Sequence, residues 1–161
     1  MGESLKSLSR HVRPGGQLWF WVYRKPPPLR ELADTYLRGA ITTMAPGDAL
    51  TQLTALTELG QALARLGARI EVPAIALLGV PAGQYDLQQF VFDYLIRVFY
   101  RAELSDQRNL LAAWDWYRPA LAHTHTEQEV RRFCVHADLD VEWLSTTPSG
   151  ISVFARARHR G

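Results

Sequence analysis

The run QLWFWVY, from Gln17 to Tyr23, constrains the fold more than any other stretch of this chain. The preceding Pro14-Gly15-Gly16 predicts a tight turn, because proline ends a helix and glycine accepts positive φ angles. Alternate side chains of a strand point to opposite faces, and both faces of this run are apolar. One face carries Leu18, Phe20 and Val22, and the other carries Trp19, Trp21 and Tyr23. Since strands apolar on both faces are typical of sheets covered on both sides, we expect a strand of a doubly covered α/β sheet.

A helix and two further strands are expected near the other end of the sequence. Thr126 is followed three residues later by Glu129, which is the spacing of a capping box at a helix start. Residues 139–146 and 151–158 then read as strands, joined by the turn residues Pro148-Ser149-Gly150. These residues therefore predict a helix followed by a pair of sheet strands.

The intervening residues predict mainly helices. Apolar residues at helical spacing favour a helix from Pro28 to Gly39, one with a leucine stripe from Leu50 to Leu66, and one over residues 85–100. A fourth helix is expected after the cap residue Ser105, and the expected caps of the leucine helix are Asp48 at its start and Gly67 at its end.

The whole chain is thus expected to be a single partial α/β domain, residues 1–161. Residues 1–24 and 124–161 would form the sheet, and residues 25–123 would form a large helical insertion between its two parts.

Composition narrows the function classes. Eighteen Lys and Arg residues against 16 Asp and Glu give a net charge of +2, which is little reason to expect a nucleic-acid partner. The local excess of Arg156, Arg158, His159 and Arg160 leaves a phosphate-binding tail as an alternative to a solvated one. A single cysteine excludes an internal disulfide, and no apolar run is long enough to span a membrane, so we expect a cytoplasmic protein.

Three stretches resemble parts of a known family. LSRHVRPGGQLWFWVY (Leu8–Tyr23) resembles the segment that enters the fifth strand of class I S-adenosylmethionine-dependent methyltransferases. HTHTEQEVRRFCVHADLDVEWL (His123–Leu144) is similar to their last helix and sixth strand, and SGISVFARAR (Ser149–Arg158) to their final antiparallel strand. GVPAGQYDLQQFVFDYL and DWYRPALAHTHT, within the insertion and at its end, resemble the helical cap of a bacterial subgroup.

The resemblance implies the C-terminal part of a Rossmann-like fold, with three strands and the last one antiparallel between the other two. In the family, a glycine-rich loop after the first strand and an acidic residue ending the second hold S-adenosylmethionine, and this sequence contains neither. The resemblance therefore implies the substrate-binding half of a small-molecule methyltransferase that is inactive alone. S-adenosylmethionine would bind the complete enzyme and not this chain by itself.

This interpretation implies a partner for the chain, and it leaves one alternative function open. The first strand would need a neighbour on its far edge, so an N-terminal half or a second copy of the chain is an expected partner, beside the small-molecule substrate. The alternative is a non-catalytic helical binding or interaction module derived from the same fold.

Polar residues that could serve a substrate site gather around the sequence DWYRPALAHTH. Methyl transfer needs a positioned acceptor and, in some cases, a base, and His123 is the expected catalytic base. The expected substrate-binding residues are Tyr23, Tyr85, Asp86, Asp115, Tyr117 and His125. Asp86 is also an expected helix cap, and Trp114 and Trp116 are expected core residues. A metal pair of His123 and His125, with Asp115 or Asp86 as third ligand, is an alternative, although we expect no metal.

Overall fold

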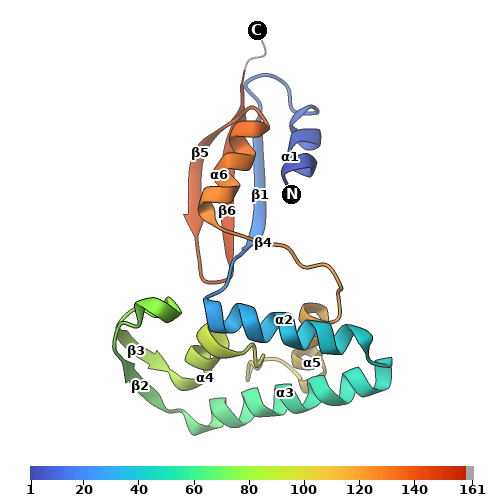
Figure 1. The fold of residues 1–161 in the computed structure, drawn as a ribbon, viewed down its shortest axis with the longest axis vertical. Coiled ribbons are helices and arrows are strands. Elements are labelled where there is room, and N and C mark those ends of the chain that lie inside the picture. The colour runs from blue at the N-terminus through green and yellow to red at the C-terminus, as the bar shows by residue number, and fades with distance from the viewer. Residues whose placement is uncertain (159–161) are drawn as a thin grey trace. The chain divides into compact units, whose positions relative to one another are not determined.

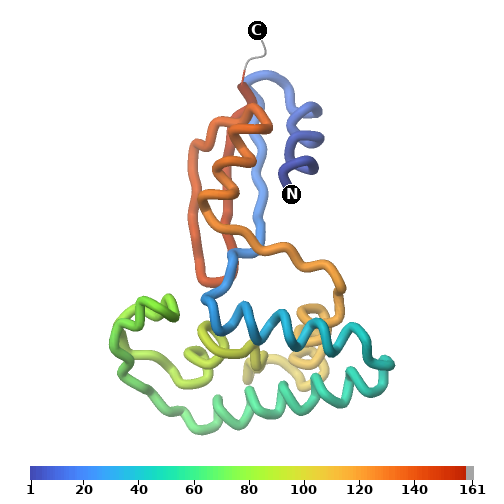
Figure 2. Tube along the Cα trace, in the orientation of Figure 1, coloured from blue at the N-terminus to red at the C-terminus, as the bar shows by residue number. Residues whose placement is uncertain are grey.

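A computed structural model describes residues 1–158 of the chain (Figure 1). The chain divides into two compact units, and each is described by itself. Residues 1–25 together with residues 123 onward form the sheet unit, and Pro26–Ala122 form the helical unit. These divisions fall within one residue of the boundaries expected from the sequence. The continuous trace in Figure 2 shows the chain leaving the sheet unit after its first strand and re-entering it before α6 (Glu127–His136).

Four strands form the sheet of the first unit. They are β1 (Gln17–Arg24), β4 (Thr124–His125), β5 (Leu139–Thr146) and β6 (Gly150–Ala157), in the order β4-β1-β6-β5. β6 runs antiparallel to both β1 and β5, so the prediction that the last strand lies between the other two is confirmed. The short β4 pairs in parallel with the end of β1. The molecule is therefore an α/β protein with a mixed sheet.

Two helices complete the core of the sheet unit. α1 (Gly2–Ser9) packs against α6, and their apolar side chains meet one face of the sheet. The buried members of this core are Leu5, Val22, Val130, Cys134, Ala137, Leu139, Ile151, Val153, Ala155 and Ala157. The capping box is confirmed: the Thr126 hydroxyl accepts from the Glu129 amide, and the Glu129 carboxylate accepts from the Thr126 amide.

The opposite face of the sheet differs from the expectation of cover on both sides. Trp19 is 61% exposed and Trp143 is 53% exposed, and Trp21 and Tyr23 are also exposed. The register places Trp19 and Trp143 on either side of Phe154, so aromatic side chains cross three strands. The prediction was wrong for these residues because aromatic residues at alternate positions of a strand can form either a buried face or an exposed face of the sheet.

The helical unit is built on three longer helices. They are α2 (Pro28–Thr43), α3 (Pro46–Leu66) and α5 (Asp106–Tyr117). Proline begins α2 and α3, where its missing N–H costs nothing, and Gly67 ends α3 in the left-handed conformation. The Ser105 hydroxyl caps α5 as expected. The core contains Ile41, Ala49, Leu53, Ala113 and Tyr117.

Other expectations for this unit were wrong. α2 continues through Gly39 to Thr43, and Ala45, not Asp48, is the N-cap of α3. The sequence also did not predict the hairpin of β2 (Arg69–Val72) and β3 (Gly83–Asp86), which is linked through the short 3₁₀ turn Ala76–Leu78.

The helix expected over residues 85–100 is confirmed only in part. One α-helical turn, α4 (Leu87–Phe90), is followed by a π-helical turn over Val91–Leu95, whereas Tyr85 and Asp86 belong to β3 and the chain leaves the helix at Ile96. Periodicity could not separate these states, because 11 of the 16 residues are apolar or aromatic. In the described residues, no helix is both long enough and apolar enough to cross a bilayer.

Gly60 of α3 lies where the chain around Val98 packs closely against that helix, and a substitution there tests this packing. A Cβ at Gly60 would lie 2.9 Å from the Val98 carbonyl oxygen, so backbone would have to move. We expect Gly60→Ala to lower the free energy of unfolding by about 1–3 kcal/mol. Urea denaturation followed by circular dichroism measures the change.

Gly39→Ala is the matched control in the same unit. A Cβ at Gly39 meets nothing within 4 Å, and the residue lies inside α2. We expect this substitution to raise the free energy of unfolding by about 0.5–1 kcal/mol. Equal effects of the two substitutions would contradict the close approach at Gly60.

Candidate functional site

A groove in the sheet unit brings together three of the seven residues that the sequence predicted for a site. Parallel pairing aligns Tyr23 with Thr124 and Arg24 with His125, so His123 and His125 flank the carboxyl end of β1. The groove has a volume of about 440 Å³. Its lining consists of Met1, Ser4, Trp21, Val22, Tyr23, His123 and His125, and we call it the histidine groove.

His125 is the more firmly held of the two imidazoles. Its ring meets the Phe133 ring edge to face at 5.3 Å, and its backbone carbonyl accepts a hydrogen bond from the Lys25 amide at 2.8 Å. Burial lowers the pKa of His125, although the Glu129 carboxylate opposes this shift. A lowered pKa keeps the imidazole neutral near pH 7, the form that can accept a proton. His123 is exposed on the adjoining segment.

The structure does not assemble the metal alternative. Within residues 1–158, no group of three His, Cys, Asp or Glu side chains is placed to hold a metal ion. Asp86 and Asp115, the third ligands considered from the sequence, both belong to the helical unit.

Tyr85 and Asp86 serve the local structure of the helical unit. The Asp86 carboxylate accepts from the Gln89 amide at 3.0 Å and caps α4, which confirms the cap interpretation. The Tyr85 hydroxyl donates to the Pro81 carbonyl oxygen at 2.8 Å, and its ring packs against Phe90. These contacts account for both side chains without a substrate, so we assign them structural roles.

Asp115 and Tyr117 lie on α5 with contrasting exposure. Asp115 is exposed to solvent, whereas Tyr117 has no exposed surface. The Tyr117 hydroxyl lies 3.2 Å from Asp34 Oδ1 and 3.3 Å from the Arg97 carbonyl oxygen. The single hydroxyl hydrogen of Tyr117 is shared between these two internal acceptors. We therefore assign Tyr117 to the packing of the helical unit, and not to the substrate contact predicted from the sequence.

Asp34 belongs to a buried charge network that the sequence analysis missed. Arg30, 2% exposed, lies four residues before Asp34 on α2, and its Nε is 3.6 Å from Asp34 Oδ2. Arg30 Nη1 is 3.8 Å from Asp93 Oδ1 in the π-helical turn. Burial raises the pKa of Asp34, with Arg30 and Tyr117 acting against the rise. The network could have been predicted from the four-residue spacing of Arg30, Asp34 and Arg38, which puts the three charged side chains on one face of the expected helix.

Cation–aromatic stacking extends this network. The guanidinium of Arg30 lies 5.1 Å from the Phe92 ring centre, and that of Arg97 lies 5.2 Å from the same ring and 3.0 Å from the Trp116 ring. Arg38 stacks more loosely on Trp116, at 5.8 Å. The Nε atoms of Arg30, Arg38 and Arg97 are buried without a hydrogen-bond partner among the described residues, so ring stacking and the ion pairs of Arg30 hold these guanidinium groups in place. The network therefore reads as structural.

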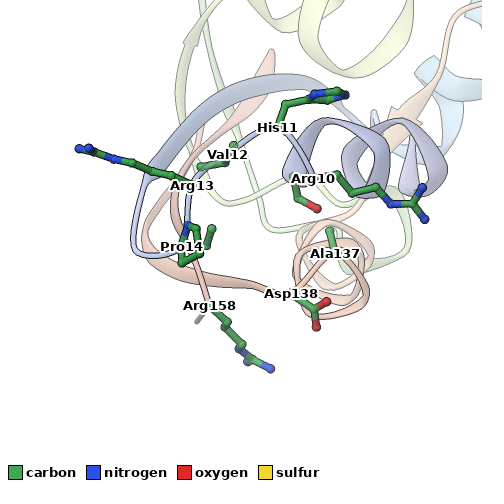
Figure 3. Close-up of a pocket in the computed structure, with 10 residues that line it drawn as sticks. Arg10, His11, Val12, Arg13, Pro14, Ala137, Asp138 and Arg158 are labelled. Carbon is green, nitrogen blue, oxygen red and sulfur yellow. The ribbon is translucent and has the colours of Figure 1, made fainter. Parts of the chain in front are cut away.

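A second hollow in the sheet unit carries positive charge, with a volume of about 280 Å³ (Figure 3). Arg10, His11, Arg13 and Arg158 contribute to its lining, together with Asp138. Figure 3 shows the basic side chains pointing away from one another. Arg158 also pairs with Asp140 at 2.7 Å. The charges do not converge on a phosphate-sized ligand, and His159 and Arg160 of the predicted basic tail lie outside the described residues.

Comparison of the chain with protein-family models, with curated proteins and with solved structures finds no match. The functional argument therefore rests on the geometry of the histidine groove and on the topology of the sheet.

The packing role of Tyr117 predicts a loss of stability when its hydroxyl is removed. Tyr117→Phe leaves a buried carboxylate without one of its donors, and we expect the free energy of unfolding to fall by about 1–3 kcal/mol. Tyr36→Phe is the control, because Tyr36 is 74% exposed on α2, and its change should stay within about 0.5 kcal/mol. Chemical denaturation measures both. Matching stabilities for the two variants would show that the Tyr117 hydroxyl does not support the network.

Proposed function

We propose that this chain is the C-terminal, substrate-binding portion of a class I S-adenosylmethionine-dependent small-molecule methyltransferase. The observation that carries the proposal is the strand order β1-β6-β5 with β6 antiparallel to both neighbours. This is the arrangement that the resemblance implies for the last three strands of the family. In this proposal the helical unit, Pro26–Ala122, is the cap that contributes to substrate specificity.

The position of the histidine groove supports a substrate role. Open α/β sheets bind ligands outside the carboxyl ends of their strands, and the groove lies at that end of β1. A neutral imidazole there can take the proton that a hydroxyl or amine acceptor loses when it gains a methyl group. His123 and His125 are both candidates for this proton transfer, and Tyr23 can orient the acceptor.

The cofactor must be held by residues that this sequence does not contain. S-adenosylmethionine, when bound to a complete enzyme, supplies an electrophilic methyl group on sulfur. The open edge of β1 supports the addition of a further strand: within the described residues, β4 pairs in register only with Tyr23 and Arg24, leaving Gln17–Val22 without a strand on that side. A segment that carries the glycine-rich loop would supply that strand.

The alternative is a non-catalytic binding module built on the same fold. The aromatic row of Trp19, Phe154 and Trp143 favours it, because its two tryptophans are exposed and such a surface can bind a partner without any chemistry. An added cofactor-binding segment distinguishes the two functions, because only the methyltransferase would then bind S-adenosylmethionine.

A reconstitution experiment tests the proposal. We expect the chain alone not to bind S-adenosylmethionine, because the loop that approaches the cofactor is absent from its sequence. Co-expression with the residues encoded immediately upstream of Met1 should give a complex that binds S-adenosylmethionine in calorimetry. Micromolar binding by the chain alone would contradict the proposal, and so would an upstream region without a glycine-rich strand-loop-helix. A complex that forms but binds no cofactor would favour the binding module.

His123 is expected to affect turnover more than folding in that complex. His123 is exposed, so His123→Ala should leave the melting temperature nearly unchanged and reduce methyl transfer by about 10²-fold or more. His136→Ala, an exposed histidine at the end of α6, is the control and should retain full turnover. Full turnover of His123→Ala would remove His123 from the mechanism and leave His125 as the base.

A further inference from the structure

The helical unit contains a groove along α3 and α5 that is lined by none of the seven residues predicted for a site. Its apolar part has a volume of about 490 Å³ and is lined chiefly by Pro46, Leu50, Leu110, Leu111 and Trp114. Its polar part has a volume of about 320 Å³. The two parts adjoin, because Gln107 and Leu110 line both. We call the whole surface the α3–α5 groove.

The polar part of the groove is rich in hydrogen-bond acceptors. Its polar lining consists of Thr54, Thr57, Glu58, Gln61, Tyr100, Asp106 and Gln107. The Thr54 and Thr57 hydroxyls each donate to a carbonyl one turn earlier, both at 2.9 Å. A hydroxyl has one hydrogen, so only the oxygen lone pairs of these two groups remain.

Gln61 and Tyr100 extend the same pattern. The Gln61 amide nitrogen donates to the Tyr100 hydroxyl at 3.4 Å, which leaves the Gln61 amide oxygen as an acceptor. The Tyr100 ring adds an aromatic group of the kind that attracts cations. A ligand that satisfies the threonine oxygens and the Gln61 amide oxygen must therefore bring donor hydrogens, while the Tyr100 hydroxyl and the second Gln61 N–H remain donors of the groove itself.

The charges of the groove point to a cationic ligand. Glu58 and Asp106 are exposed carboxylates, and among the residues that line either part of the groove none is Lys or Arg. A protonated amine carries three donors and a positive charge, which complements the acceptors and the two carboxylates. The adjoining apolar part, with two exposed leucines (Leu50 and Leu111) and Trp114, suits a hydrocarbon chain attached to that amine.

We propose that the α3–α5 groove binds a small amphiphilic amine, with the ammonium group between Glu58, Asp106 and Tyr100 and the apolar body along Leu50, Leu111 and Trp114. The site lies within the helical unit and does not depend on the methyltransferase proposal, since none of its residues belongs to the histidine groove.

Calorimetry with three probes of equal chain length tests the proposal on the full chain. The probes are n-octylamine, which is protonated at pH 7 as a lysine side chain is, n-octanol and octanoate. We expect octylamine to bind at least about tenfold more tightly than octanoate, with octanol between them. Amide NMR signals of Gly47 and Gln107 should shift on binding, because both residues line the groove.

Two variants separate the charge from the apolar surface. Glu58→Gln should weaken octylamine binding by about tenfold and leave octanol binding unchanged, because only the amine uses the charge. Leu111→Ser should weaken all three probes. Glu71→Gln, at an exposed position on β2, is the matched control and should bind octylamine as the parent chain does.

The proposal makes several results impossible, and each of them would overturn it. They are equal binding of octylamine and octanoate, equal effects of Glu58→Gln and Glu71→Gln, and NMR shifts confined to the aromatic face around Trp19 and Trp143. Occupation of the groove by an apolar peptide helix without any preference for amines would likewise overturn it.

Discussion

The antiparallel pairing of β1 with β6 is the interaction on which the sheet unit depends. It aligns Gln17 with Arg156 and continues without a break to Tyr23 and Gly150. It joins strands from opposite ends of the sequence, so forming it closes a loop that contains the whole helical unit. The entropy cost of closure grows only slowly with loop length, which is why an insertion of this size is tolerated. The apolar pairs Leu18–Ala155 and Phe20–Val153 then bury one face and offset that cost.

A different principle holds the helical unit together. Its small apolar core includes Tyr117, and the buried Arg30 and Asp34 extend this core beyond its apolar members. Burying a charge is unfavourable unless it is paired, and here each charge has a partner of opposite sign or an aromatic ring. Reciprocal contacts add to this: Arg38 donates to the last turn of α5 and Arg118 to the carbonyls at the end of α2. Cations suit these positions because helix carbonyls there lack partners.

The parts of the fold that could be predicted are those in which local signals and packing agree. The capping box at Thr126, the turn at Pro14-Gly15-Gly16 and the cap at Ser105 each act within a few residues, and the elements that follow them, α6, β1 and α5, were placed well. Residues 85–100 carried one such signal, the cap at Asp86, and none that marks where the following helix ends. Their conformation depends on contacts with residues distant in the sequence: Val98 lies against Gly60 of α3, and Arg30 of α2 pairs with Asp93. Propensity cannot anticipate these contacts.

The candidate site was predicted in part for a related reason. DWYRPALAHTH is continuous in the sequence, yet its residues divide between two units that fold around different cores. Asp115 and Tyr117 follow the helical periodicity of α5, which makes one exposed and the other fully buried. His123 and His125 follow the pairing of β4 with β1, which puts them at the carboxyl end of a strand more than a hundred residues earlier in the chain. Polar residues that adjoin in sequence therefore form one site only where a single element or sheet edge holds them. The two histidines meet this condition, and the tyrosine and aspartate of α5 belong to the packing of the helical unit.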